Sequence, residues 1–93
     1  MARDRFLGTT VIDIGCGAGR LTRELMLRGA GEVVGMDISE VALRLARALA
    51  VGLAGNPCFE QGDMESMPWP SERFDVAFGA RRLSTYFTPT KAL

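Results

Sequence analysis

Three glycines and an aspartate at alternate positions, Asp13, Gly15, Gly17 and Gly19, are the residues of this 93-residue chain whose spacing most suggests chemistry. They follow an apolar run at residues 11–14, and a helical pattern begins directly after them. A buried strand, a tight turn and a helix start in this order are typical of nucleotide-type sites in α/β proteins. Glycine has no Cβ, so such a loop can adopt left-handed dihedrals and approach a ligand closely. A glycine-rich turn with no ligand remains the structural alternative.

The spacing separates two classes of ligand. A dinucleotide fingerprint requires a third glycine at the position that Arg20 occupies here, because that glycine packs the helix on the strand. The chain therefore departs from the pattern of an NAD-binding oxidoreductase domain. That function stays the less favoured alternative.

Two more carboxylates follow predicted strands. Asp37 lies about twenty residues after the glycine loop, where a carboxylate can accept hydrogen bonds from both ribose hydroxyls. It could equally begin a helix, since Ser39 is a plausible N-cap. Asp63, which follows Gly62, could accept a hydrogen bond from an exocyclic amino group, with Met64 beside an adenine face. A plain Gly-Asp turn is the alternative there.

The elements that would position these residues alternate along the chain. We expect strands at residues 11–14, 32–36, 58–61 and 74–78 and helices at residues 18–28 and 40–51. This order predicts an α/β fold with a parallel sheet. Gly29 is expected to cap the first helix, and Leu45, Ala46 and Leu49 are expected to pack the second helix on the sheet.

The composition narrows the function. Eleven basic and eleven acidic residues cancel, so no net charge favours nucleic acid or a membrane surface as partner. No apolar run is long enough to span a bilayer and no secretion signal is evident, so we expect a cytoplasmic location. The two cysteines and the absence of histidine give no metal site. Without a histidine to activate it, Cys16 is expected to be a packed loop residue rather than a nucleophile.

Taken in order, these motifs, together with the run Met67-Pro68-Trp69-Pro70 and the pair Phe74-Asp75, resemble a known family. The series is similar to the cofactor-binding half of class I S-adenosylmethionine (SAM)-dependent methyltransferases of the ubiquinone/menaquinone-biosynthesis type. The resemblance covers roughly residues 10–79. It implies a Rossmann-like parallel sheet with flanking helices and SAM as cofactor.

The resemblance also implies a role for each site residue. Asp13 and the backbone of Gly15 and Gly17 would hold the methionine moiety. Asp37 would bind the ribose hydroxyls, and Asp63 would contact the adenine amino group. Ile38 and Met64 would flank the adenine, and Gly79 and Ala80 would lie near the sulfonium. The cofactor-binding residues implied are Asp13, Gly15, Cys16, Gly17, Gly19, Asp37, Ile38, Asp63, Met64 and Gly79. No catalytic residue is implied, because SAM carries its own leaving group.

The chain is shorter than the family pattern. Residues 1–80 would form a partial SAM-binding domain, truncated after the fourth strand, and residues 81–93 an atypical tail. We expect the sheet face opposite the helices to be uncovered, which would forfeit about 7 kcal/mol for roughly 300 Å² of apolar surface. The fourth strand should present a bare edge.

A truncated enzyme with a small-molecule acceptor and little or no activity alone is the reading we favour. A non-catalytic SAM- or nucleotide-binding module that needs a partner chain is its main alternative. Self-association, or a partner chain over the uncovered sheet face, is expected in either case.

Overall fold

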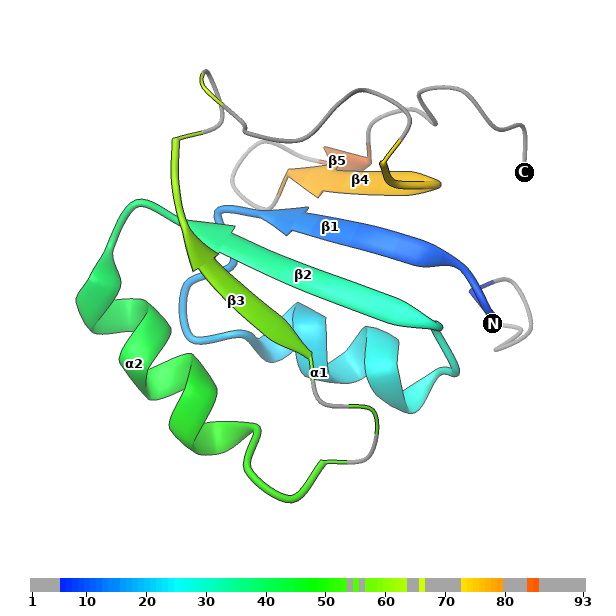
Figure 1. Ribbon diagram of the computed structural model, residues 1–93, viewed down its shortest axis with the longest axis horizontal. Helices are drawn as coiled ribbons and strands as arrows, with labels where there is room; N and C mark the ends of the chain where they lie inside the picture. The colour runs from blue at the N-terminus through cyan, green and yellow to red at the C-terminus, as the bar shows by residue number, and fades with distance from the viewer. Residues whose placement is uncertain are drawn as a thin grey trace.

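The fold is a twisted sheet with two helices (Figure 1). The computed structural model describes residues 6–53, 55, 57–63, 66, 73–79 and 84–85. Its strands are β1 (Thr10–Ile14), β2 (Glu32–Asp37), β3 (Cys58–Gln61), β4 (Val76–Gly79) and β5 (Ser84–Thr85). Its helices are α1 (Arg20–Leu27) and α2 (Glu40–Leu49). All four predicted strands and both helices are therefore confirmed, with bounds that differ by at most two residues.

The strand order β3-β2-β1-β4-β5 places β1 at the centre of the sheet. β1 pairs in parallel with both β2 and β4, and β2 pairs in parallel with β3. The order reverses direction at β1, since β2 and β3 lie on one side of it and β4 on the other. In open α/β sheets such a reversal opens a crevice beyond the carboxyl ends of the strands, which is where ligands bind.

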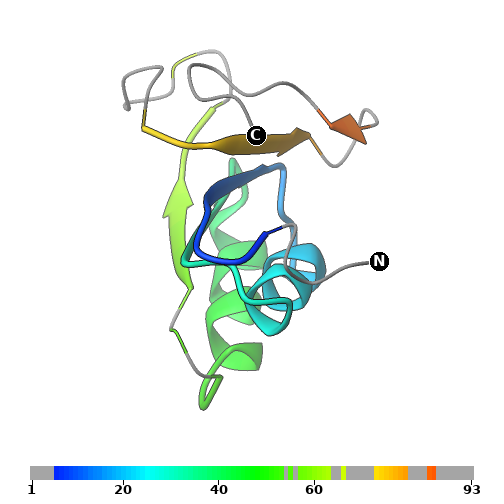
Figure 2. The ribbon, with the colours of Figure 1, turned by 90° about the vertical axis from the view of Figure 1, so that its right-hand side faces the viewer.

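Both helices cover one face of the sheet (Figure 2). Leu25 of α1 packs with Val11 and Val33. Leu43 of α2 packs with Phe59, which occupies the same face of β3. This arrangement follows from two right-handed crossovers that step the same way along the sheet. The residues that end and begin the helices are those the sequence predicts. Gly29 has a φ of 97° after α1, and the Ser39 hydroxyl accepts from the Ala42 amide at the start of α2.

The buried face of α2 differs from the expected one. Leu43, Ala46 and Ala50 are buried, whereas Leu45 and Leu49 are about half exposed. The prediction that Leu45 and Leu49 pack on the sheet is therefore wrong. The helix carries apolar residues around most of its circumference, so its spacing alone offers two candidate stripes.

The sheet face opposite the helices was expected to be uncovered, but its centre is buried. Ile12, Val34 and Met36 are at most 3% exposed and pack together with Ala77 and with Phe74, which lies two residues before β4. The predicted loss of about 7 kcal/mol from exposure of this face is therefore wrong for the strands at its centre. At the β3 edge this face is open, since Cys58 is exposed there.

The β4 edge is not bare either. β5 pairs antiparallel with β4 through Phe78↔Thr85 and Gly79↔Ser84. Residues 84–85 lie in the segment expected to be an atypical tail, and its short strand could not be predicted because two residues carry no measurable periodicity.

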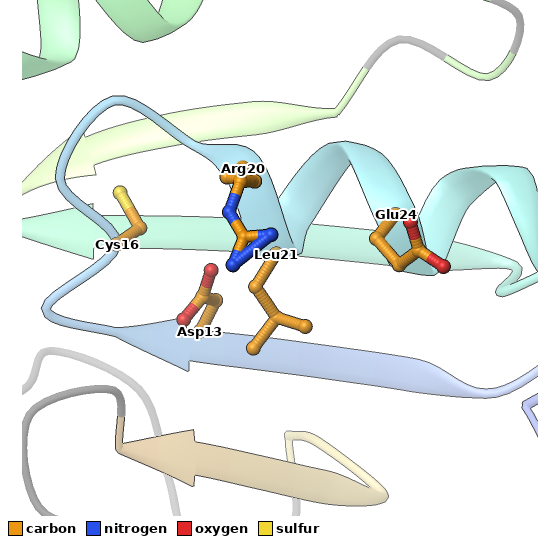
Figure 3. A pocket seen from close by; sticks show the side chains of 5 residues that line it. All are labelled: Asp13, Cys16, Arg20, Leu21 and Glu24. Carbon is orange, nitrogen blue, oxygen red and sulfur yellow. The ribbon is translucent and has the colours of Figure 1, made fainter.

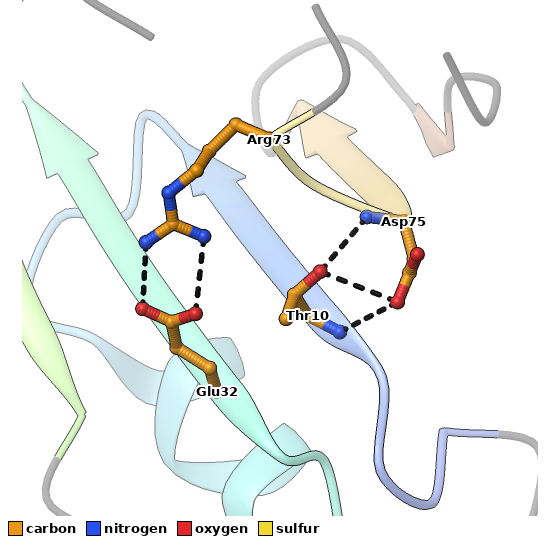
Figure 4. A network of polar contacts seen from close by, with 4 residues as sticks. All are labelled: Thr10, Glu32, Arg73 and Asp75. Atoms are coloured by element: carbon orange, nitrogen blue, oxygen red, sulfur yellow. Dashed lines mark hydrogen bonds and ion pairs between the residues drawn. The ribbon is translucent and has the colours of Figure 1, made fainter. Parts of the chain in front are cut away.

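Polar contacts fix the start of β4 against its neighbours (Figure 4). The Asp75 carboxylate accepts from the Thr10 amide at 3.0 Å and from the Thr10 hydroxyl at 3.2 Å. Arg73 donates to both Glu32 oxygens, at 3.0 and 2.7 Å, so it joins the β4 lead-in to the first residue of β2. These contacts set the register that brings the end of β4 beside the glycine loop.

Candidate functional site

The glycine loop connects β1 to α1 and is held by the end of β2. The amides of Gly15 and Cys16 both donate to the Met36 carbonyl, at 2.7 and 3.0 Å. Gly15, Gly17 and Gly19 have φ values of 76°, 57° and 85°, which side chains other than glycine rarely adopt. The loop is thus a fixed, left-handed turn at the carboxyl edge of the sheet.

The three glycines have different surroundings. A Cβ at Gly15 or Gly17 would meet no atom within 4 Å, so the backbone there faces open space. A Cβ at Gly19 would lie 3.1–3.2 Å from Phe59 and Ala46, so Gly19 allows α1 to start close to α2 and β3. Gly15 and Gly17 therefore form a surface that a ligand can approach, while Gly19 serves packing.

Asp37 joins three loops at the sheet edge. One carboxylate oxygen accepts from the Gly17 amide at 2.7 Å, and the other accepts from the Ser39 amide at 2.9 Å. Its carbonyl accepts from the Gly62 amide at 3.0 Å. Both readings of this residue given by the sequence are compatible with this geometry, since the carboxylate lies at the glycine loop and also precedes the N-cap of α2.

Asp13 is fully buried beneath the loop. Its Oδ2 accepts from the Thr22 hydroxyl of α1 at 2.8 Å, and its Oδ1 has no hydrogen-bond partner. Burial raises the pKa of this carboxyl from 3.8 to about 6, the Thr22 hydrogen bond opposes the rise, and the charge of Asp37 adds to it. An unpartnered buried carboxylate oxygen is costly, which makes Asp13 a candidate ligand group.

A cavity of about 270 Å³ opens beside Asp13, between β1 and α1 (Figure 3). It is lined by Asp13, Cys16, Arg20, Leu21 and Glu24. The side chains of Asp13 and Arg20 both extend into the space between the strand and the helix. The glycine loop closes one end of this space, so the cavity is continuous with the candidate site.

Cys16 is a packing residue, as expected for a cysteine in a chain that has no histidine to activate it. It is buried with Leu43 and Phe59, and its Sγ would lie 3.0 Å from a Cβ at Gly35. Burial, with a smaller contribution from the nearby carboxylates of Asp13 and Asp37, raises the pKa of this thiol from 9.0 to about 12. The thiolate that a nucleophile requires is therefore disfavoured.

The other predicted site residues that the structure describes lie at the same edge of the sheet. Ile38 is 68% exposed directly after Asp37. Asp63 is exposed and follows the end of β3, where Gly62 is bonded to Asp37. Gly79 pairs with Ile14 at the end of β1. Met64 and Ala80 lie outside the described residues.

Two site residues were not predicted from the sequence. Thr22 is fully buried and holds Asp13, but a threonine inside a helical pattern gives no sign of its partner nine residues earlier. Gly35 in the middle of β2 was detectable, because glycine inside a strand often marks a close approach. A Cβ there would lie 2.8–3.0 Å from Phe59 and Cys16.

Two further properties of the described residues concern metal ions and membranes. No group of three or more acidic, cysteine or histidine side chains there could hold a metal ion. None of the described helices is both long and apolar enough to cross a membrane.

Comparisons with known proteins identify the family of this chain. A family model described as a methyltransferase domain matches residues 6–93. The ubiquinone/menaquinone biosynthesis C-methyltransferase UbiE of Ectopseudomonas mendocina is 42% identical over 84 residues, which are 83% of this chain and 33% of the relative. The chain therefore spans about a third of the length of this curated relative.

Solved structures show the same relationship. An S-adenosylmethionine-dependent methyltransferase from Mesorhizobium loti matches 80% of this chain and 33% of its own, with a TM-score of 0.72 and 34% identity. Phosphoethanolamine N-methyltransferase 1 of Haemonchus contortus, solved with phosphoethanolamine and S-adenosylhomocysteine, matches 80% of this chain and 16% of its own, with a TM-score of 0.73 and 26% identity.

Proposed function

This chain belongs to the methyltransferase-domain family of class I SAM-dependent enzymes, and we propose that it binds SAM at the carboxyl edge of its sheet for methyl transfer to a small-molecule acceptor. SAM is the cofactor of this family. The observation that carries the proposal is the loop geometry. Gly15 and Gly17 face open space directly above a buried aspartate whose Oδ1 has no partner.

The residues present fit this cofactor. The Oδ1 of Asp13 is an acceptor suited to an ammonium group, and the methionine moiety would lie on the backbone of Gly15 and Gly17. Asp37 accepts one hydrogen bond at each oxygen from the backbone, and each oxygen has a further lone pair for a ribose hydroxyl. Asp63 and Ile38 would contact the adenine.

The chemistry demands little of the protein's own side chains. SAM supplies an activated methyl group on a sulfonium, so the protein contributes orientation and exclusion of water. The high pKa of the buried Cys16 thiol is compatible with this division, because no covalent step through the chain is required.

We infer further that these 93 residues bind cofactor but turn over little on their own. Two observations support this inference. The chain spans about a third of the length of its curated relative. The described site residues lie where the cofactor would bind. A non-catalytic module completed by a partner chain is the alternative, and it uses the same cofactor residues. A cytosolic location is part of the proposal, supported by Cys16 and Cys58 both being free thiols.

Isothermal titration of the chain with S-adenosylhomocysteine and with NAD tests the proposal. We expect S-adenosylhomocysteine to bind more tightly, because Arg20 occupies the position of the glycine that a dinucleotide fold requires. Tighter binding of NAD would reject the methyltransferase assignment of this site and favour the oxidoreductase alternative.

A further inference from the structure

Arg20, the first residue of α1, stands out among the arginines of the helical layer. Its side chain lines the cavity that also contains Asp13 (Figure 3). Among the described residues, no hydrogen bond or ion pair engages its guanidinium. Arg23, three residues further along α1, instead donates to the Ala18 carbonyl at 2.7 Å and so contacts the loop.

The cavity therefore holds two opposite charges that lack partners within it. Asp13 presents an unpartnered oxygen from β1, and Arg20 presents a guanidinium from α1. Glu24, the other carboxylate of the lining, pairs with Arg28 at 2.8 Å on the helix surface. A ligand group with an ammonium and a carboxylate on one carbon has the charges that this pair of side chains can complement.

We infer that Arg20 is a specificity-determining residue that binds the carboxylate of the amino-acid end of the cofactor, opposite the ammonium held by Asp13. This inference rests on the proposed function. Two features support it. A guanidinium presents parallel N–H groups that match a carboxylate. The start of α1 also carries the positive end of the helix dipole, which favours an anion in the same place.

The same geometry gives position 20 a role that a glycine could not fill. A residue at position 20 begins α1, and its side chain can return over the loop toward β1. Glycine there would leave the cavity without a cation. Arg20, whose presence argues against a dinucleotide, would thus recognise the amino-acid end of the cofactor.

Titration of variants with three ligands tests the inference. S-Adenosylhomocysteine carries both charges, its decarboxylated analogue S-adenosyl-3-thiopropylamine keeps only the ammonium, and 5′-methylthioadenosine has neither. We expect Arg20→Met to weaken S-adenosylhomocysteine binding about tenfold or more, the scale of a charge-assisted hydrogen bond. Binding of the other two ligands should change by less than about twofold. Arg20→Lys should restore part of the loss.

Arg44→Met is the matched control, since Arg44 is exposed on α2 and away from the cavity, and all three affinities should be unchanged. Melting curves verify that each variant is folded. Equal weakening of the carboxylated and decarboxylated ligands by Arg20→Met, or no weakening at all, would overturn the role of Arg20 while the proposed function stands. If neither S-adenosylhomocysteine nor 5′-methylthioadenosine binds the unmodified chain, both the inference and the proposed function fail.

Discussion

Asp37 combines a structural and a binding role in one carboxylate, because it receives the amides of Gly17 and Ser39 at its two oxygens. We predict that Asp37→Ala weakens S-adenosylhomocysteine binding at least about tenfold, since a hydrogen bond to a charged group contributes about 1.5–3 kcal/mol. It should also lower the melting temperature, because two backbone amides lose their acceptor.

Ser39→Ala separates the two roles. It removes only the hydroxyl that accepts from Ala42, so it should destabilise the fold by about 1 kcal/mol and leave the affinity unchanged. Titration calorimetry and thermal melts measure both quantities. An Asp37→Ala protein that binds S-adenosylhomocysteine like the unmodified chain would contradict the ribose assignment.

The burial of Asp13 predicts a pH dependence of stability. Its pKa rises from 3.8 in the unfolded chain to about 6 in the fold, so the folded state retains a proton that the unfolded state has lost between these values. This carboxyl therefore lowers the free energy of unfolding progressively as pH rises from about 4 to about 6, by at most about 3 kcal/mol, and by a constant amount above that.

Asp13→Asn should remove this dependence, while its amide oxygen keeps the Thr22 hydrogen bond. The stability of the variant minus that of the unmodified chain should therefore grow from pH 4 to pH 6 in urea titrations. A stability difference that is independent of pH would show that burial does not raise the pKa of Asp13.

For single residues, the sequence predicts the carboxylates of the site but not the groups that contact them. Asp13 and Asp37 were predictable, because Asp13 lies in an apolar strand two residues before the first glycine and Asp37 follows the next apolar run about twenty residues after the loop. Thr22 and the cavity position of Arg20 were not, because they depend on how α1 rotates against β1.

Among the elements, α2 shows where apolar spacing is ambiguous. Leu43 is fully buried against Phe59, while Leu45 is 52% exposed. We predict that Leu43→Ala lowers the free energy of unfolding by about 2–5 kcal/mol. Leu45→Ala should change it by less than about 1 kcal/mol. Chemical denaturation of the two variants makes the comparison, and equal losses would mean that both stripes of the helix are packed.

Helix ends were predicted better than helix faces. Ser39 and Gly29 act through local hydrogen bonding and φ, which the sequence around them determines. The choice between two apolar stripes is made by the sheet that the helix meets. That choice depends on β3, which supplies Phe59 from a distant part of the chain.

For the whole molecule, the parallel order and the helix layer follow from the alternation of elements and the handedness of crossovers. The burial of Ile12, Val34 and Met36 on the opposite face was not predictable in this way. Alternation of elements says which face the helices take, but it does not say what else lies on the sheet. The pairing of β5 with β4 was missed as well, because the two residues of β5 are too few to show a strand pattern.

We predict that the 93-residue chain transfers no more than a single methyl group per molecule from labelled SAM to small acceptors. Orientation of the acceptor supplies much of the rate in such a reaction, and the described site residues gather on the cofactor side. A radiolabel transfer assay against phenolic, quinone and amine acceptors measures turnover, with heat-treated chain as the blank. Sustained turnover by a monomer would contradict this prediction.

If the cofactor lies on the glycine loop above Asp13, as we propose, titration with S-adenosylhomocysteine should shift the amide resonances of that loop. We expect the largest chemical-shift changes at Gly15, Gly17 and Ile38, since the first two face open space and the third follows Asp37. Gly52, beyond the far end of α2, should not shift. Saturable shifts that centre elsewhere, with Gly15 and Gly17 unchanged, would contradict this placement.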